Sequence, residues 1–390
     1  MDYQGSTLTD SPIRIKWMWK SNLDPWNQSQ PAEWSHYSDA ENRIIEEAYT
    51  AKQTHAILDD YCIDFQHLIQ ISNNEEKNQR PVKRLAGDRN DKRLREERFI
   101  FNPIAPKRPF GGHYGWISPF ITEVRQDLKL NPRQLPSQDD TIRPMIVEKA
   151  AFGIIEEGKK IGKQREAKWM AEQLMAQKEN GMKEVWKCCA HLYSMESFLY
   201  KKLNEIMRLI GSEEHEHVWR SKIRTFGPFC LLLWDDPINK KPNKGKELLY
   251  RGANLTGTQI ATYRNLSQRP DEYRSFQAFT SCSRNRTKAE IFGNALFIIK
   301  VSYAFTVDLS SSSEYPYEEE ELIAPAVCFT VQQVEFDETT NKHLIYLDLR
   351  QRFNSKCEQL LHNFLCEPTN LFLKVDFLIY LLAELSLSAN

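Results

Sequence analysis

The sequence predicts an α+β protein with more than one module, and three observations support that prediction. Residues 13–20 alternate apolar and polar side chains, as a half-buried strand does. Residues 144–209 repeat apolar side chains at helical spacing, and residues 247–349 hold short apolar runs separated by turn residues. A chain of 390 residues also exceeds the usual length of one domain.

Composition argues against several classes of function. The net charge is −1, so we expect no membrane partner and no sequence-specific nucleic-acid partner. The eight cysteines contain no C-x-x-C pair, and we expect no metal site. Residues 1–11 are polar and acidic, unlike a signal peptide, and the apolar stretch 371–387 is too short and too charged to span a bilayer. We therefore expect a cytoplasmic or nuclear protein.

The first module has a clear order of predicted elements. They are strands at 13–20 and 33–37, a helix at 42–50 opened by Ser38 and Asp39, strands at 55–61 and 63–71, and a basic tail at 80–84.

This module, residues 11–85, resembles the WWE domain. The likeness rests on Trp17, Trp19, Trp34, Tyr37, the run from Ile45 to Tyr49, the run from Tyr61 to Phe65, Gln70 and Arg80. The resemblance implies a half-barrel of strands with one helix. It also implies binding of the iso-ADP-ribose unit of poly(ADP-ribose).

Three residues of this module match the ligand pocket of binding WWE domains. Tyr61, Gln70 nine residues on and Arg80 ten beyond that have the family's spacing. The Tyr61 ring can stack on adenine, the Gln70 amide can hydrogen-bond a polar edge or hydroxyl of the ligand, and the Arg80 guanidinium can bind phosphate. One departure is Ser35, which stands where binding members often have a second Trp.

The rest of the chain divides into three further parts. Residues 86–144 form a linker and an aromatic, Pro-rich segment, and residues 351–390 form a C-terminal tail. Between them, residues 145–350 begin with two long helical tracts, 144–180 and 182–209, and continue with strands. The predicted strands are 247–251, 275–281, 295–301, 305–309, 321–324, 328–336 and 343–349.

The most unusual stretch is the run of four carboxylates from Glu318 to Glu321, directly before Leu322-Ile323-Ala324-Pro325. Such a run is compatible with a solvated acidic loop. If strand geometry begins within it, Glu319 and Glu321 point to the same side and two carboxylates face one cleft.

Two motifs upstream of the acidic run favour a functional interpretation. Residues 248–252 are an apolar strand ending in Arg251-Gly252, and residues 279–283 end in Ser281-Cys282-Ser283. Together with the Glu-x-Glu spacing, they resemble the arginine-type mono-ADP-ribosyltransferases over residues 145–350. The resemblance implies a helical lobe packed on a two-sheet β core.

The resemblance assigns roles to the residues that bind and cleave NAD. Arg251 contacts the pyrophosphate, and Gly252 lets the backbone approach the nicotinamide amide. Ser281 orients Glu321, the catalytic carboxylate that stabilises an oxocarbenium-like transition state. Tyr250 adjoins the same cofactor site.

Two further roles concern the leaving group and the acceptor. Phe292 stands where the family stacks a ring on nicotinamide; packing in the core is the alternative. Glu319 is the first Glu of the motif, which goes with arginine as the acceptor, because a carboxylate can orient a guanidinium and take its proton. Tyr315 or Tyr317 would lie on the acceptor-recognition loop.

The sequence therefore predicts an NAD-dependent protein-arginine mono-ADP-ribosyltransferase that uses NAD as its substrate and needs no metal. Its partners would be proteins with an exposed arginine, together with poly(ADP-ribose) or ADP-ribosylated proteins. Two alternatives remain: an NAD glycohydrolase, or a catalytically inactive reader of ADP-ribose.

Overall fold

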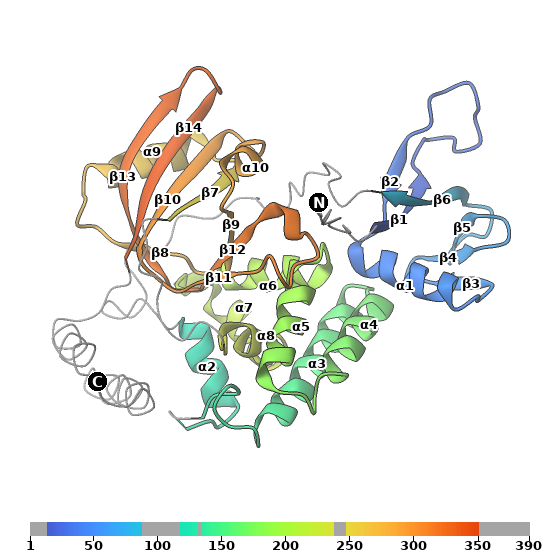
Figure 1. Ribbon diagram of the computed structural model, residues 1–390, viewed down its shortest axis with the longest axis horizontal. Helices are drawn as coiled ribbons and strands as arrows, with labels where there is room; N and C mark the ends of the chain where they lie inside the picture. Colours follow the sequence, from blue (N-terminus) through green and yellow to red (C-terminus); the bar gives the residue numbers. More distant parts are fainter. Residues whose placement is uncertain (1–13, 88–117, 132–133, 238–246, 351–390) are drawn as a thin grey trace, which may run out of the picture.

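The computed structural model describes residues 14–87, 118–131, 134–237 and 247–350. An N-terminal strand-rich module lies beside a lobe of helices, and a larger sheet lies against the other side of that lobe (Figure 1). The α+β class predicted from the sequence is confirmed. The predicted C-terminal tail, residues 351–390, and most of the first half of the predicted linker lie outside the described residues.

The N-terminal module is one six-stranded antiparallel sheet of order β2-β1-β6-β5-β4-β3 with a single helix. Its elements are β1 (Arg14–Lys20), β2 (Trp34–His36), α1 (Asp39–Thr50), β3 (His55–Ile57), β4 (Tyr61–Asp64), β5 (Ile69–Ser72) and β6 (Gln79–Gly87). Ser38 caps α1 in a capping box with Glu41. Trp17, Ile45 and Ile63 are buried in the core between helix and sheet.

Two expectations for this module differ from the structure. Two strands were predicted over residues 55–71, and the chain forms three there, β3, β4 and β5. The predicted basic tail is strand β6, which pairs with β1 on one side and β5 on the other. Backbone hydrogen bonds to β1, at the other end of the module's sequence, help to define this strand, and no local pattern reports them.

The helical lobe contains α2 (Pro119–Asp127), α3 (Arg143–Lys160), α4 (Gln164–Met175), α5 (Met182–Ser194), α6 (Phe198–Met207), α7 (Glu216–Arg220) and α8 (Ile223–Trp234). The first predicted long helix is two helices, because Gly162 adopts a positive φ of 72° between α3 and α4. Helix α2, which the sequence analysis did not predict, buries Phe120, Ile121 and Val124 in the lobe.

The larger sheet has eight strands in the order β11-β12-β9-β7-β10-β14-β13-β8. They are β7 (Leu248–Ala253), β8 (Arg274–Ser275), β9 (Thr280–Ser283), β10 (Ala295–Tyr303), β11 (Thr306–Asp308), β12 (Glu320–Ile323), β13 (Cys328–Asp337) and β14 (Lys342–Arg350), with α9 (Gly257–Ser267) and α10 (Arg286–Glu290) in the connections. Strands β7 and β9 meet through one residue pair, Tyr250 with Ser283. The two sheets implied by the resemblance are thus two groups of strands joined at that pair.

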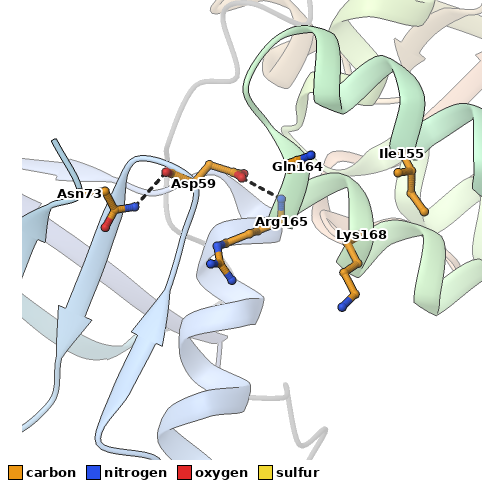
Figure 2. Close-up of a pocket in the computed structure, with 6 residues that line it drawn as sticks. All are labelled: Asp59, Asn73, Ile155, Gln164, Arg165 and Lys168. Carbon is orange, nitrogen blue, oxygen red and sulfur yellow. Dashed lines mark hydrogen bonds between the residues drawn. The ribbon is translucent and has the colours of Figure 1, made fainter.

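The N-terminal module contacts the helical lobe through several acidic side chains and through Ala40, which is buried in the core of the lobe. The carboxylate of Asp59 accepts from the backbone N–H of Arg165 at 2.8 Å (Figure 2). It also accepts from the backbone N–H of Glu166 at 3.3 Å, and so caps the start of α4. Glu41 and Asp60 both pair with Lys163. A cavity of about 570 Å³ opens beside this junction between Asn73 and Lys168.

Not one helix within the described ranges is long and apolar enough to cross a bilayer.

Candidate active site

The first of the three predicted motifs places a buried guanidinium in the middle of the sheet. Arg251 on β7 is 2% exposed, and its Nη1 donates to the carbonyl oxygen of Ser281 at 2.6 Å. The next residue, Gly252, lies tightly against the segment after α10: a Cβ there would be 2.6 Å from the carbonyl oxygen of Phe292. The absence of a side chain at Gly252 therefore lets Phe292 lie against β7.

The second motif supplies a buried hydroxyl. Ser281 on β9 is 3% exposed, and its Oγ has no hydrogen-bond partner among the described residues. Ser283, two residues on, instead donates to the carbonyl oxygen of Glu318 at 2.7 Å. Because buried hydroxyls are normally paired, Ser281 is a polar group for which the fold itself supplies no partner.

The third motif places a carboxylate in the sheet interior. Glu321 on β12 is 3% exposed, and Arg284 Nη1 lies 3.3 Å from its Oε2. Arg284 also pairs with Asp308 at 2.8 Å. Burial raises the pKa of Glu321 above its ordinary value, although the Arg284 guanidinium and a hydrogen bond with Thr306 act in the opposite direction.

Strand register decides which of these side chains share a face. Glu321 lies opposite Cys282, whereas Ser281 lies opposite Leu322 and Ser283 lies opposite Glu320. Directly opposed residues point to the same side of a sheet. The structure therefore brings the Arg251 side chain to the Ser281 backbone and puts Glu321 on the adjoining strand. The Ser281 side chain points to the opposite face from Glu321, so the expected orienting of Glu321 by this hydroxyl is not found; Glu320 lies on the face of the two serine hydroxyls. Glu320 is 2% exposed.

Glu319 does not belong to the strand. Strand β12 begins at Glu320, and Glu319 has a positive φ of 51° after the short 3-10 turn Pro316–Glu318. The alternation that the sequence predicted for Glu319 and Glu321 therefore fails at this residue. The Glu319 side chain is 43% exposed and accepts from Lys288 Nζ at 2.8 Å, which lowers the pKa of its carboxyl.

The acidic run is consequently not a uniformly solvated loop. Its last two members are buried in β12, while Glu319 stays near the surface. Two carboxylates in opposite electrostatic settings lie two residues apart. Two carboxyl groups in such different environments can serve different roles in one transfer reaction.

The predicted ligand residues of the N-terminal module lie on neighbouring strands. Gln70 on β5 is directly opposite Arg80 on β6 and Ile63 on β4, so Tyr61, two residues before Ile63, shares its face. Gln70 accepts from the hydroxyl of Tyr37 at 2.6 Å. Arg80 Nη1 donates to the carbonyl oxygens of Lys20 and Asn22, at 3.0 and 2.7 Å.

Some contacts at these sites were not predicted from the sequence. Lys288 contacts Glu319 and Arg284 contacts Glu321, and neither residue has a role in the sequence analysis. Tyr37, which was named only for the WWE likeness, contacts Gln70. Each of these contacts joins residues more than thirty positions apart, so no local spacing indicates it. The described residues hold no cluster of three or more His, Cys, Asp or Glu side chains able to bind a metal ion.

Comparison with known proteins gives two family matches. Residues 15–84 match the WWE domain, and residues 152–355 match the family described as NAD:arginine ADP-ribosyltransferase. No curated protein sequence matches the chain.

Solved structures with a similar chain path include ADP-ribosyltransferases of three bacteria. HopU1 of Pseudomonas syringae is 18% identical, with 46% of this chain and 82% of that one covered and a TM-score of 0.35. An ADP-ribosyltransferase of Clostridium botulinum is 15% identical, with 50% and 95% covered and a TM-score of 0.34. Exoenzyme S of Pseudomonas aeruginosa, bound to carba-NAD, is 16% identical, with 57% and 99% covered and a TM-score of 0.34.

The transferase match spans more than half of the chain and includes all three motifs, on β7, β9 and β12. Enzymes of this family use NAD as their substrate. The chain belongs to the NAD:arginine ADP-ribosyltransferase family and carries a WWE domain ahead of its transferase domain.

Proposed function

We propose that this chain transfers single ADP-ribose units from NAD to arginine side chains of acceptor proteins. The observation that carries the proposal is the pair of carboxylates two residues apart, Glu321 buried with a raised pKa and Glu319 exposed with a lowered one. Ser281 lies on β9, the strand next to that of Glu321, and Arg251 lies on β7, on the other side of β9. In this proposal they form the NAD site with Tyr250, Gly252 and Phe292.

The roles follow from the chemistry of the reaction. The bond from the ribose C1′ to the nicotinamide nitrogen breaks, and nicotinamide leaves as a neutral molecule, so no strong acid is required. Glu321 supports the positive charge that develops on the ribose. An acceptor guanidinium nitrogen then forms the new bond to C1′, and its proton passes to Glu319, which hydrogen bonding from Lys288 keeps ionised.

The acceptor is tested with labelled NAD, the full-length chain, and two matched peptides that carry either arginine or lysine at the same positions. We expect label on the arginine peptide only, and Glu319→Gln should abolish this transfer while nicotinamide release continues. Equal labelling of both peptides, or nicotinamide release without labelling of either, would contradict arginine as the acceptor. The second result would favour an NAD glycohydrolase.

We also propose that the WWE domain binds the ADP-ribose polymer through Tyr61, Gln70 and Arg80. The support is that the three share one face of the sheet and that Tyr37 and two backbone carbonyls fix Gln70 and Arg80 in place. Arg80→Ala in the full-length chain should weaken polymer binding at least tenfold, the usual value of a charged contact to phosphate.

Lys83 is the matched control for Arg80. It is a cation on the same strand, but the alternation of β6 places it on the other face, where its Nζ lies 4.0 Å from the Trp34 ring centroid. Lys83→Ala should leave polymer binding nearly unchanged. Equal losses for the two variants would mean that binding follows net charge rather than the proposed pocket.

A further inference from the structure

The loop that precedes β12 and carries Glu319 is buried over part of its length. Ser313 and Glu314 are each 8% exposed and Tyr315 is 1% exposed, whereas Tyr317 is half-buried. Tyr315 therefore cannot be a surface ring that touches an acceptor. Tyr315 is buried because it contacts the WWE domain.

Tyr315 binds the first residue of helix α1. Its hydroxyl lies 2.8 Å from both carboxylate oxygens of Asp39, a residue that is itself 4% exposed. The same carboxylate accepts from the backbone N–H of Glu196 at 2.6 Å, between α5 and α6. Asp39 thus joins three segments: the WWE helix, the helical lobe and the loop before Glu319.

A second contact lies one helical turn along α1. Arg43 Nη2 is 2.9 Å from Glu314 Oε2, and the Glu314 backbone N–H donates to Ser194 Oγ at 2.7 Å. His191 Nε2 lies 3.6 Å from the same Glu314 oxygen. Residues four apart lie on the same face of a helix. Asp39 and Arg43 therefore bind two neighbouring residues of one loop, Tyr315 and Glu314.

We propose that helix α1 of the WWE domain is a positioning element of the transferase, which holds the acceptor side of the active site through Asp39 and Arg43. Glu319 has a left-handed backbone conformation, which a non-glycine residue keeps only when its surroundings fix it. Asp39 and Arg43 fix the loop on one side of Glu319, and Lys288 holds Glu319 itself. Arg251 and Glu321 lie in strands and do not depend on this loop.

This inference rests on the proposed function for the role of Glu319, and it makes a distinct prediction. Loosening the loop should impair transfer to the acceptor and spare NAD cleavage. The most conservative change is Tyr315→Phe, which removes one hydroxyl and leaves Asp39 bound to Glu196. Asp39→Asn is the reciprocal change.

Glu47 provides the matched control. It is another carboxylate of α1, and it accepts from Trp169 Nε1 of α4 at 3.0 Å, across the same domain junction but away from the loop. Glu47→Gln therefore weakens the junction without touching the loop. Any effect of Tyr315→Phe that is absent from Glu47→Gln is therefore caused by the loop contact and not by a weaker domain junction.

The experiment uses the full-length variants with NAD and agmatine, a small guanidinium acceptor, and measures nicotinamide release together with agmatine modification. For Tyr315→Phe we expect KM for agmatine to rise about tenfold, the factor for a lost hydrogen bond to a charged group. We expect KM for NAD and nicotinamide release to stay within twofold of wild type. Wild-type behaviour of Tyr315→Phe, or an equal change in Glu47→Gln, would overturn the inference.

A second measurement does not need an acceptor. Backbone amide hydrogen exchange at residues 314–319 should be faster in Tyr315→Phe and Asp39→Asn than in wild type, and unchanged in Glu47→Gln. If wild type modifies no guanidinium acceptor, the proposed function fails and this exchange measurement still decides the inference. Unchanged exchange in both loop variants would overturn the inference while leaving the proposed function standing.

Discussion

Two adjacent glutamates at the start of β12 compete for the catalytic role. The motif spacing favours Glu321, which is buried beside Arg284, whereas strand register places Glu320 on the face of Ser281 and Ser283. Both are nearly inaccessible to solvent, so exposure does not distinguish them. Sequence spacing identifies the acidic run, but only register shows that the two side chains emerge on opposite faces.

Single amide replacements separate the two residues. Glu321→Gln should lower nicotinamide release from NAD by about 10²-fold or more, because it removes the charge that faces the developing cation. Glu320→Gln should retain most of the cleavage activity. Steady-state rates of both full-length variants make the comparison, and the reverse order would assign the catalytic role to Glu320.

Gly252 should tolerate no side chain. A Cβ there would meet the carbonyl oxygens of Ala289 and Phe292 at 2.3 and 2.6 Å, and both atoms are backbone. Gly252→Ala should therefore displace the Phe292 segment, raise KM for NAD and lower the free energy of unfolding by about 1–3 kcal/mol.

Gly257 is the control for Gly252, since nothing lies within 4 Å of a Cβ at that position, the first residue of α9. Gly257→Ala should leave KM for NAD unchanged and stabilise the chain by up to about 1 kcal/mol. Enzyme kinetics and denaturant unfolding of both variants give the test. A Gly252→Ala variant with the wild-type KM for NAD would mean that the Phe292 segment does not border the NAD site.

At the scale of elements, the first turn of helix α4 contains a buried glutamate, Glu166. Glu166 is 1% exposed, accepts from the backbone N–H of Phe198 at 3.3 Å and from Ser38 Oγ at 3.4 Å, and lies near Glu41, Asp59 and Lys163. Burial, together with the nearby Glu41 carboxylate, raises the pKa of Glu166 to about 7. The junction of the two domains therefore contains a carboxyl group that titrates near neutral pH.

The sign of the resulting pH dependence follows from the direction of this shift. Between the ordinary pKa of 4.5 and about 7, the folded chain binds a proton that the unfolded chain does not, so Glu166 makes stability fall as pH rises through that window. Glu166→Gln should remove this loss, which is on the order of 3 kcal/mol. Unfolding of the variant and wild type at pH 5 and pH 8 provides the measurement, and parallel pH profiles would refute the assignment.

Elements with a strong local pattern were predictable, and elements defined by distant contacts were not. The strand predicted at 295–301 opens with five consecutive apolar residues and is found as β10. Strand β6 was predicted as a basic tail, because its residues give no local sign that they pair with β1 and β5. The single long helix predicted over 144–180 failed at Gly162, whose positive φ ends α3.

At the scale of the whole molecule, the WWE domain is joined to the transferase by more than a linker. Asp39, Glu41, Glu47, Asp59 and Asp60 of the first domain all bind groups of the second. These contacts span more than a hundred residues of sequence, so the domain order could be predicted but the junction could not. Surface ion pairs contribute little individually, and the buried contacts of Asp39 and the cap from Asp59 carry more weight.

The central claim is that β7, β9 and β12 together form one NAD site, and Ser281→Ala tests it most directly. The Ser281 hydroxyl is buried without a hydrogen-bond partner among the described residues, so its removal should leave the unfolding free energy unchanged or raise it by about 1 kcal/mol. If the hydroxyl serves the NAD site, nicotinamide release by the full-length variant should nevertheless fall at least tenfold. A stable Ser281→Ala variant that releases nicotinamide at the wild-type rate would contradict the claim.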